Sequence, residues 1–390
     1  MKIRRSDNMN QLPKNIDEFG EARKKGFVKI KELKDQGHKI AGEFCAYTPW
    51  EIIAASGAIP VGLCGTSEEP IADAEKHLPR NLCPLIKSSY GFAITEKCPY
   101  MYFSDVVIGE TTCDGKKKMY ELLGKIKKVH IMQLPQTQDT EDAFKLWRHE
   151  IIKLKTFLQK EFDVEITEEK IKEMIKIKNK ERQALRNFYE LGKLDPPPLT
   201  GMEILKVLRG AGFTWDKEEQ IKDIDNIVKT VKQQYSMGNT NVPKNAKRIL
   251  ITGCPLGEAT DKIINTIEEN GGVVVAYENC GGAKNLNYLV DEQKDPIDAL
   301  TEKYLNIACS CMSPNKKRLD LISEIVDEYK VDGVVDVILQ ACHTYNLETT
   351  AIKKFVNGDK NIPYISIETD YSQKDLGQLK TRLAAFLEIL

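Results

Sequence analysis

The sequence has no long hydrophobic run and no excess of charge of either sign. Its apolar stretches, such as residues 273–276 and residues 334–339 with Asp336 inside, are only strand-length, whereas a helix that crosses a bilayer needs about 20 apolar residues. No apolar segment follows the charged residues 1–7, so we predict no signal peptide, no membrane contact and a cytoplasmic location. Lys and Arg total 57 against 58 Asp and Glu, which argues against nucleic acid as a partner.

Histidine is scarce, and close cysteine pairs are nearly absent. The five histidines include no pair at helical metal-ligand spacing, which excludes a His-rich metal site. The sequence has no C-x-x-C motif. Cys309 and Cys311, with one residue between them, are poorly spaced for zinc, and the compact ferredoxin spacings are missing. What the chain does have is ten cysteines, which in a reducing compartment indicate metal binding, redox chemistry or plain buried thiols.

Two stretches of the chain alternate strand-like and helix-like patterns, residues 40–135 and 246–390. Between them, residues 140–235 carry apolar residues at helical spacing, and residues 14–36 form the pattern of a charged amphipathic helix. We therefore predict an α/β protein with two doubly wound parallel-sheet (Rossmann-like) domains and a helical insert between them. The expected boundaries are 1–138 for the N-terminal α/β domain with its helical arm, 139–240 for the helical insert and 241–390 for the C-terminal α/β domain.

Two helix starts carry the capping-box pattern, in which a Ser or Thr side chain caps the helix and a Glu three residues later reaches back. The first is Thr48 with Glu51, and the second is Thr200 with Glu203. We predict that both pairs cap their helices through side-chain hydrogen bonds.

Half of the ten cysteines fall at or just after the end of a predicted strand, whereas a cysteine that only fills a core would sit inside a strand or on a helix face. The carboxyl ends of parallel strands are where open α/β sheets bind ligands. The cysteines at strand ends are Cys45, Cys113, Cys254, Cys280 and Cys342, while Cys83 starts a helix and Cys309 and Cys311 lie in a loop. Helix N-termini lower the pKa of a thiol, and backbone N–H groups bond to sulfur, which favours iron–sulfur ligation. The alternative is simple burial, as we expect for Cys64 and Cys98.

Two side chains near strand ends are candidate proton donors, Glu110 and His343. Glu110 ends a predicted strand, and His343 directly follows Cys342, so both would stand beside the cysteine-bearing loops. Each has a simpler interpretation. Such acids more often cap helices or pair with lysines, and a histidine at a helix start commonly faces solvent.

Several segments, in order along the chain, resemble the 2-hydroxyacyl-CoA dehydratase superfamily. They are Phe44-Cys45-Ala46-Tyr47-Thr48-Pro49-Trp50-Glu51-Ile52-Ile53, Cys280-Gly281-Gly282, Cys309-Ser310-Cys311-Met312-Ser313-Pro314-Asn315 and Ile367-Glu368-Thr369-Asp370. Within the superfamily the chain is most similar to the double-cubane cluster proteins, through Cys83-Pro84-Leu85-Ile86-Lys87-Ser88-Ser89-Tyr90-Gly91 and Ile251-Thr252-Gly253-Cys254-Pro255. The likeness covers nearly the whole chain.

The resemblance implies an iron–sulfur cofactor. Cys83, Cys113 and Cys342 match the three cysteines that hold a single 4Fe–4S cluster in the dehydratases. The double-cubane branch implies an 8Fe–9S cluster instead, in which a sulfide bridges two 4Fe–4S cubanes held by six cysteines. The added ligands implied for this chain are Cys45, Cys254 and Cys309, with Cys280 or Cys311 as alternates for one of them.

The resemblance also implies an activity. The chain would be the catalytic component of a two-component ATP-dependent reductase, an oxidoreductase of anaerobic conditions. It would be a homodimer that takes low-potential electrons from an ATP-hydrolysing iron–sulfur activator protein and reduces a small-molecule substrate. The alternative is a 2-hydroxyacyl-CoA dehydratase subunit, a lyase with one 4Fe–4S cluster, although ten cysteines exceed what three ligands require. A further alternative is an electron carrier or iron–sulfur assembly protein without a substrate of its own.

Overall fold

The strands of the described part of the chain form two parallel four-stranded sheets with the same connectivity. The computed structural model describes residues 15–255 and 257–390. The strand order is β2-β1-β3-β4 in the first sheet and β6-β5-β7-β8 in the second, so each half adds its second strand on one side and its later strands on the other. The strands are β1 (Ile40–Glu43), β2 (Ile59–Gly62), β3 (Val106–Glu110), β4 (Val129–Met132), β5 (Lys247–Gly253), β6 (Gly272–Tyr277), β7 (Gly333–Leu339) and β8 (Tyr364–Thr369). The predicted α/β fold with two Rossmann-like sheets is confirmed.

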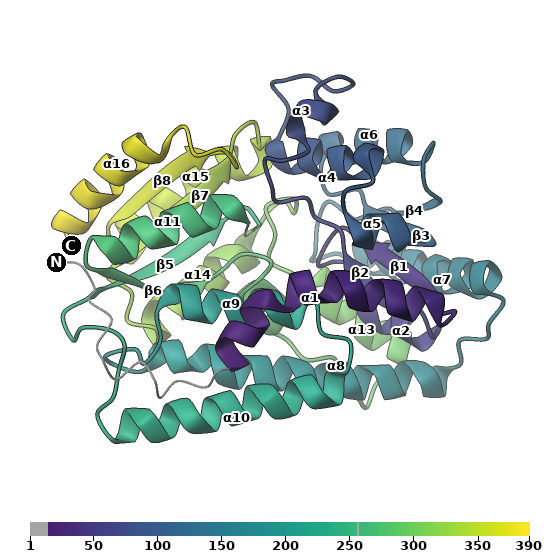
Figure 1. Cartoon of the computed structure of the whole chain (residues 1–390), viewed down its shortest axis with the longest axis horizontal. Helices are drawn as coiled ribbons and strands as arrows, with labels where there is room; N and C mark the ends of the chain where they lie inside the picture. Colours follow the sequence, from purple (N-terminus) through teal and green to yellow (C-terminus); the bar gives the residue numbers. More distant parts are fainter. Residues whose placement is uncertain (1–14, 256) are drawn as a thin grey trace.

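Helices surround both sheets (Figure 1). Those of the first half are α1 (Asn15–Asp35), α2 (Trp50–Ala55), α3 (Ile71–Ala74), α4 (Pro84–Thr95), α5 (Pro99–Phe103) and α6 (Asp114–Leu123). The connecting helices are α7 (Glu141–Phe162), α8 (Glu168–Tyr189), α9 (Gly201–Ala211) and α10 (Lys217–Ser236). Those of the second half are α11 (Glu258–Glu269), α12 (Ala283–Leu286), α13 (Pro296–Leu305), α14 (Lys316–Glu328), α15 (His343–Lys354) and α16 (Leu376–Glu388). The pieces α3, α5 and α12 are too short to show a helical period in the sequence. None of the described helices is long and apolar enough to cross a membrane.

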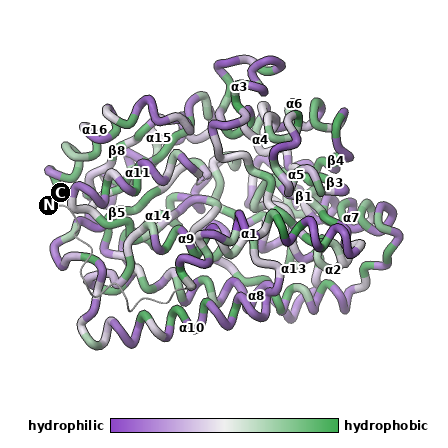
Figure 2. The backbone as a smooth tube through the Cα atoms, in the orientation of Figure 1, coloured by the Kyte–Doolittle hydropathy of each residue, from purple (hydrophilic) through white to green (hydrophobic). Residues whose placement is uncertain are grey.

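Three strands of the second sheet, β5, β6 and β7, are among the most deeply buried parts of the chain. Every residue of β6 and β7 is buried, and so are all residues of β5 after Lys247. A parallel sheet covered by helices on both faces needs such continuous apolar strands. In Figure 2 these strands run largely green through the interior, while the outer helices α8 and α10 alternate between purple and green along their length.

One helix contributes to the apolar cores of both halves. The 22-residue α8 is about 33 Å long at 1.5 Å per residue. Near its start, Ile171 and Ile175 belong to the core that contains Ala41 of β1. Near its end, Leu185 and Phe188 belong to the core that contains β5, β6 and β7. Figure 1 shows α8 and α10 running together along one edge of the molecule, below both sheets. The two sheets are therefore tied to one rigid element.

The second half also sends a helix into the core of the first. On α13, Ile297, Leu300 and Tyr304 pack with Trp147 of α7 in the core beneath the first sheet. A third apolar cluster joins α4 of the first half to Leu339 at the end of β7. Parts of the second half of the chain therefore belong to cores of the first half. These shared cores bring the strand ends of both sheets close together.

One of the two predicted capping boxes is present and the other is wrong. Thr200 and Glu203 form the box at the start of α9. At α2, Pro49 occupies the cap position without a side-chain cap. Glu51 instead lies fully buried, with Oε1 2.8 Å from the Arg182 guanidinium nitrogen of α8. The Thr48 hydroxyl donates to Glu110, and the Trp50 N–H at the start of α2 donates to the Tyr304 hydroxyl at 3.2 Å, so tertiary partners replace the predicted cap.

The buried pair between Glu51 and Arg182 gives a stability prediction. Glu51→Gln keeps the shape of the side chain but leaves the buried Arg182 without its counter-charge. We expect the free energy of unfolding in urea to fall by about 3–5 kcal/mol. The matched control is Lys172→Gln on α8, which removes the cation of an exposed pair with Glu168 at 3.8 Å. That variant should stay within about 0.5 kcal/mol of wild type. Equal losses in both variants would contradict the structural role of the pair.

Candidate metal centre

Cysteines follow the four central strands of the two sheets, at the positions where the strand order reverses. Cys45 lies two residues after β1 and Cys113 three after β3, and β1 pairs with β3. Cys254 directly follows β5 and Cys342 comes three residues after β7, and β5 pairs with β7. Doubly wound sheets bind ligands in the crevice at this reversal point. Both halves therefore present thiols where the fold places a ligand site.

The first thiol group consists of Cys83, Cys113, Cys254 and Cys342, with two members from each half of the chain. The Cys254 and Cys83 thiols hydrogen-bond to the Cys342 sulfur and lower the pKa of Cys342 to about 3, against the effect of burial. Cys113 lies near enough for the Cys342 charge to raise its pKa, after the larger effect of burial. Cys83, Cys113 and Cys342 are the N-cap residues of α4, α6 and α15. Three helix N-termini thus converge on one set of sulfurs, which favours thiolates.

Backbone N–H groups also point at this group. The Leu339 N–H donates to the Cys254 sulfur at 3.2 Å. The Lys116 N–H donates to the Cys113 sulfur at 3.5 Å. Such bonds stabilise negative charge on sulfur and tune the potential of a bound cluster.

The second thiol group consists of Cys45, Cys280, Cys309 and Cys311. A hydrogen bond from the Cys311 thiol lowers the pKa of Cys309 to about 5, with burial opposing and the Lys284 charge assisting. Burial raises the pKa of Cys280 to about 12 and that of Cys45 well above its usual value, and the Cys309 charge adds to both shifts. In each group one thiol therefore loses its proton before the others, and the resulting thiolate is the form that binds metal.

Two buried lysines lie beside the thiols. Lys116 on α6 donates to the Phe44 carbonyl oxygen at 3.0 Å, and its charge lowers the pKa of Cys45 in the second group and of Cys113 in the first, against the larger effect of burial. Lys284 on α12 lies 2.9 Å from a carboxylate oxygen of Glu278, and its charge lowers the pKa of Cys309. Burial lowers the pKa of both lysines, but the negative groups around them outweigh it and the net shift is upward. Both lysines therefore stay cationic and balance thiolate charge.

The two predicted proton donors differ in their surroundings. Glu110 ends β3, is fully buried and accepts a hydrogen bond from the Thr48 hydroxyl. Burial raises the pKa of Glu110 to about 7, with Lys116 opposing. His343 is exposed at the first position of α15, beside Cys342. Glu110 can therefore carry a proton at neutral pH inside the protein, whereas His343 faces solvent.

Two cysteines remain. The Cys64 thiol donates to the Phe44 carbonyl oxygen at 2.9 Å and lies near enough to Cys280 to raise the pKa of Cys280, after the larger effect of burial. Cys98 caps α5 and packs in the cluster around α4.

Sequence reasoning missed the lysines at 116 and 284. Their signal was a strand-end glutamate six residues earlier, with a cysteine between, at both places. That sequence pattern does not indicate a functional site unless the burial of the lysines is known.

The chemistry of the donor set fits an iron–sulfur cluster. Thiolates are the soft donors that select iron–sulfur clusters. The two groups hold eight thiols, and N–H donors and buried cations lie beside them. Within residues 15–255 and 257–390, no set of three or more His, Cys, Asp or Glu side chains is placed to hold one metal ion.

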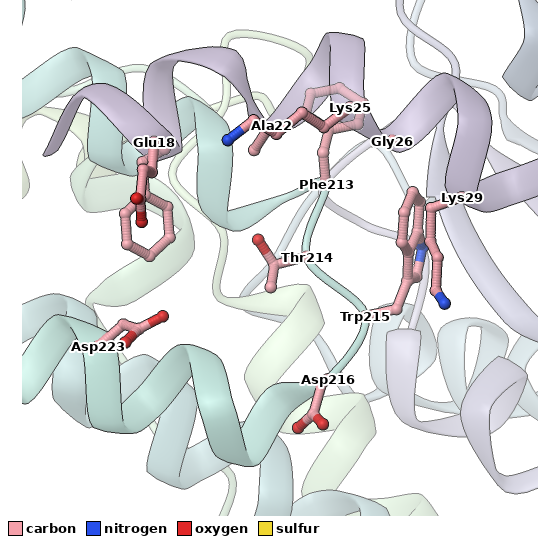
Figure 3. Close-up of a pocket in the computed structure, with 11 residues that line it drawn as sticks. Glu18, Ala22, Lys25, Gly26, Lys29, Phe213, Thr214, Trp215, Asp216 and Asp223 are labelled. Carbon is pink, nitrogen blue, oxygen red and sulfur yellow. The ribbon is translucent and has the colours of Figure 1, made fainter. Parts of the chain in front are cut away.

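A pocket of about 310 Å³ lies away from these thiols, between α1 and the turn from α9 to α10 (Figure 3). Phe213, Thr214 and Trp215 of the turn face Lys25 and Lys29 of α1. Its lining includes no cysteine and no predicted site residue. The thiols and the candidate proton donors lie at the strand ends instead.

The chain is similar to known proteins over nearly its whole length. The family model for the D-component of 2-hydroxyglutaryl-CoA dehydratase matches residues 45–390. A protein of Escherichia coli (strain K12) named "Putative dehydratase subunit YjiM" is 54% identical over 98% of this chain and 99% of its own. The (R)-phenyllactyl-CoA dehydratase beta subunit of Clostridium sporogenes is 25% identical over 93% of this chain and 94% of its own. The beta subunit of (R)-2-hydroxyglutaryl-CoA dehydratase from Acidaminococcus fermentans is 22% identical over 96% of this chain and 98% of its own.

The first thiol group predicts which cysteines oxidise together. In metal-free protein, mild diamide oxidation should link Cys342 to Cys83 or Cys254, because only neighbouring sulfurs reach bonding distance without backbone movement. Cys98 should stay reduced. Peptide mapping by mass spectrometry identifies the linked pairs, and a disulfide between Cys342 and Cys309 would show that the two groups are not separate.

The buried Glu110 carboxyl predicts a pH dependence of stability. Its pKa is 4.5 in the unfolded chain and about 7 in the folded chain. Because the folded chain holds the proton more tightly, the contribution of Glu110 is complete below pH 4.5 and is lost as the pH rises to about 7. Relative to wild type, metal-free Glu110→Gln should gain on the order of 3 kcal/mol of unfolding free energy across this interval. Urea titrations at each pH measure it, and parallel profiles would contradict the assignment.

Proposed function

Because the chain belongs to the 2-hydroxyglutaryl-CoA dehydratase D-component family, we propose that it is the catalytic component of a two-component ATP-dependent iron–sulfur reductase. The observation that carries the proposal is the pair of thiol groups, which include the four cysteines that follow the central strands at the two strand-order reversals. The two groups comprise eight cysteines, more than the three that one 4Fe–4S cluster needs. The proposed cofactor is an 8Fe–9S double cubane.

The structure suggests how the cysteines divide between the two cubanes. Cys83, Cys113 and Cys342 would hold the first cubane. Cys254, which the resemblance assigned to the second cubane, lies beside Cys342, where the two halves of the chain meet. Cys45 and Cys309 would hold the second cubane, and the alternates Cys280 and Cys311 stand in the same group. A cubane in each group, with a sulfide between them, is consistent with this placement.

The cluster would supply more than one low-potential electron to a bound substrate. The chain's own residues provide what surrounds that transfer. Lys116 and Lys284 offset the negative charge of the thiolates in a buried region. Glu110 holds a proton near pH 7 and lies close enough to Cys45 to affect its pKa, after the larger effects of burial and Lys116. It is therefore the proposed proton donor, and His343 at the surface is the weaker candidate.

The proposal about partner proteins starts from the names of the relatives. Two relatives are named as beta subunits of dehydratases and one as a subunit of benzoyl-CoA reductase, so these proteins work in assemblies. We propose a homodimer of this chain that is served by an ATP-hydrolysing iron–sulfur activator protein. The proposed substrate is a small molecule. An ATP-driven supply of electrons would be needed because a cluster rich in thiolate and sulfide charge is hard to reduce.

A second function is favoured by the names of the relatives. Several of them are subunits of 2-hydroxyacyl-CoA dehydratases. In that case the chain would be a dehydratase subunit with one 4Fe–4S cluster in the first thiol group. The second thiol group would then line the space for a substrate.

Iron content separates the two functions. Protein purified without oxygen should contain about eight irons and nine acid-labile sulfides per chain if it holds a double cubane, and about four of each if it holds a single cluster. Cys342→Ser and Cys309→Ser should each lower the iron content, whereas the control Cys98→Ser should leave it unchanged. Acyl-CoA binding with four irons per chain would establish the dehydratase instead. Iron-free protein in a folded, freshly isolated sample would contradict both.

A further inference from the structure

A buried tyrosine of α15 lies against the second thiol group. The Tyr345 hydroxyl is 3.8 Å from the Cys309 sulfur. Tyr345 is only 5% exposed, so water does not compete for this contact. The residue comes from the helix that Cys342 caps, whereas Cys309 lies in the loop after α13. The contact therefore links the elements that carry the two thiol groups.

The hydrogen-bond partners of Tyr345 fix the direction of this contact. The Lys284 ammonium donates to the Tyr345 hydroxyl oxygen at 2.9 Å. An ammonium group has donors only, so the tyrosine oxygen accepts there and its own hydrogen remains for the Cys309 sulfur. Lys284 is held in turn by Glu278, at 2.9 Å, and both side chains have no exposed surface. The donor is therefore oriented before any cluster binds.

Two buried cations flank the same ring. The Lys284 nitrogen lies 5.0 Å and the Arg318 guanidinium carbon 4.9 Å from the Tyr345 ring centroid. Arg318 has no exposed side-chain surface and pairs with Glu278 at 3.2 Å. These positive charges strengthen the donor character of the hydroxyl and fix the position of the ring.

A second tyrosine in the same group serves as an internal comparison. Tyr47 is also fully buried, and its hydroxyl lies 3.8 Å from the Cys311 sulfur. Its hydrogen, however, is donated to the Ile307 carbonyl oxygen at 3.0 Å, so it is not available to the Cys311 sulfur. Tyr47 thus stands at the same distance from a cysteine sulfur without donating to it.

We propose that Tyr345, oriented by Lys284, donates a hydrogen bond to the Cys309 sulfur and thereby raises the reduction potential of the cluster at the second thiol group. This inference rests on the proposed function. A hydrogen bond to a ligand sulfur stabilises the added negative charge of the reduced cluster, so it makes reduction easier. Tyr345 and Lys284 are positioning residues, since neither is itself a ligand.

The test is a redox titration of anaerobically purified protein, followed by electron paramagnetic resonance, with iron content measured on each sample. Tyr345→Phe removes the donor and keeps the ring, so the midpoint potential should become more negative at unchanged iron content. The matched control Tyr47→Phe should leave the potential at the wild-type value. Replacing Tyr345 by 3-fluorotyrosine keeps the fold and makes the hydroxyl a stronger donor, so the potential should become more positive.

The outcomes separate this inference from the function on which it rests. Wild-type iron content with an unchanged potential in Tyr345→Phe overturns the inference and leaves the proposed function intact. An equal shift in Tyr47→Phe also overturns it, because loss of any nearby hydroxyl would then suffice. If Tyr345→Phe loses iron, the fluorotyrosine protein decides, and the absence of a positive shift there overturns the inference. Wild-type protein without iron overturns both.

Discussion

The arrangement of the two sheets depends on α8, because one helix is buried in two cores. Its first turns pack beneath β1 and β3 through Ile171 and Ile175, and its last turns pack against β5, β6 and β7 through Leu185 and Phe188. A shift of the helix along its axis would remove apolar contacts from both cores together. The buried contact between Arg182 of α8 and Glu51 of α2 fixes the register of the helix against the first sheet. The carboxyl ends of both sheets are thereby held at a set separation, which is the condition for one site built from two halves.

That site is buried and yet contains several charged side chains. Thiolates in a region of low dielectric are costly unless positive groups stand close to them. The chain supplies two buried lysines, Lys116 beside Cys45 and Cys113 and Lys284 beside Cys309, and each follows a strand-end glutamate by six residues. Glu110 and Glu278 play different parts, since burial raises the pKa of Glu110 to about 7 while Arg318 and Lys284 hold that of Glu278 below its usual range despite its burial. A repeated pattern thus yields a proton-holding acid in one half and a fixed anion in the other.

Much of the fold could be predicted from local pattern. The helices Glu258–Glu269 and Pro296–Leu305 and the strand Gly333–Leu339 have the bounds expected from periodicity and strand length. The capping box at Thr200 was also found, because both partners lie within four residues and need only the helix itself. The box at Thr48 failed because its glutamate pairs with Arg182, which is far away in the sequence. Short helices such as α3 and α12 were not predicted, because four residues contain barely one turn and show no helical period.

The sequence by itself determined the α/β class, the parallel strands and the placement of cysteines after them, because these depend on the spacing of residues along the chain. The sequence also identified the family, since its motifs occur in order and the family model matches residues 45–390. Only the tertiary structure decided which cysteines share a group. Cys254 lies with Cys342 rather than with Cys309, and Tyr345 donates where Tyr47 does not. The physical reason is that a sulfur's neighbours are set by strand order, by the helix that spans both cores and by competing hydrogen-bond partners, and none of these is local in sequence.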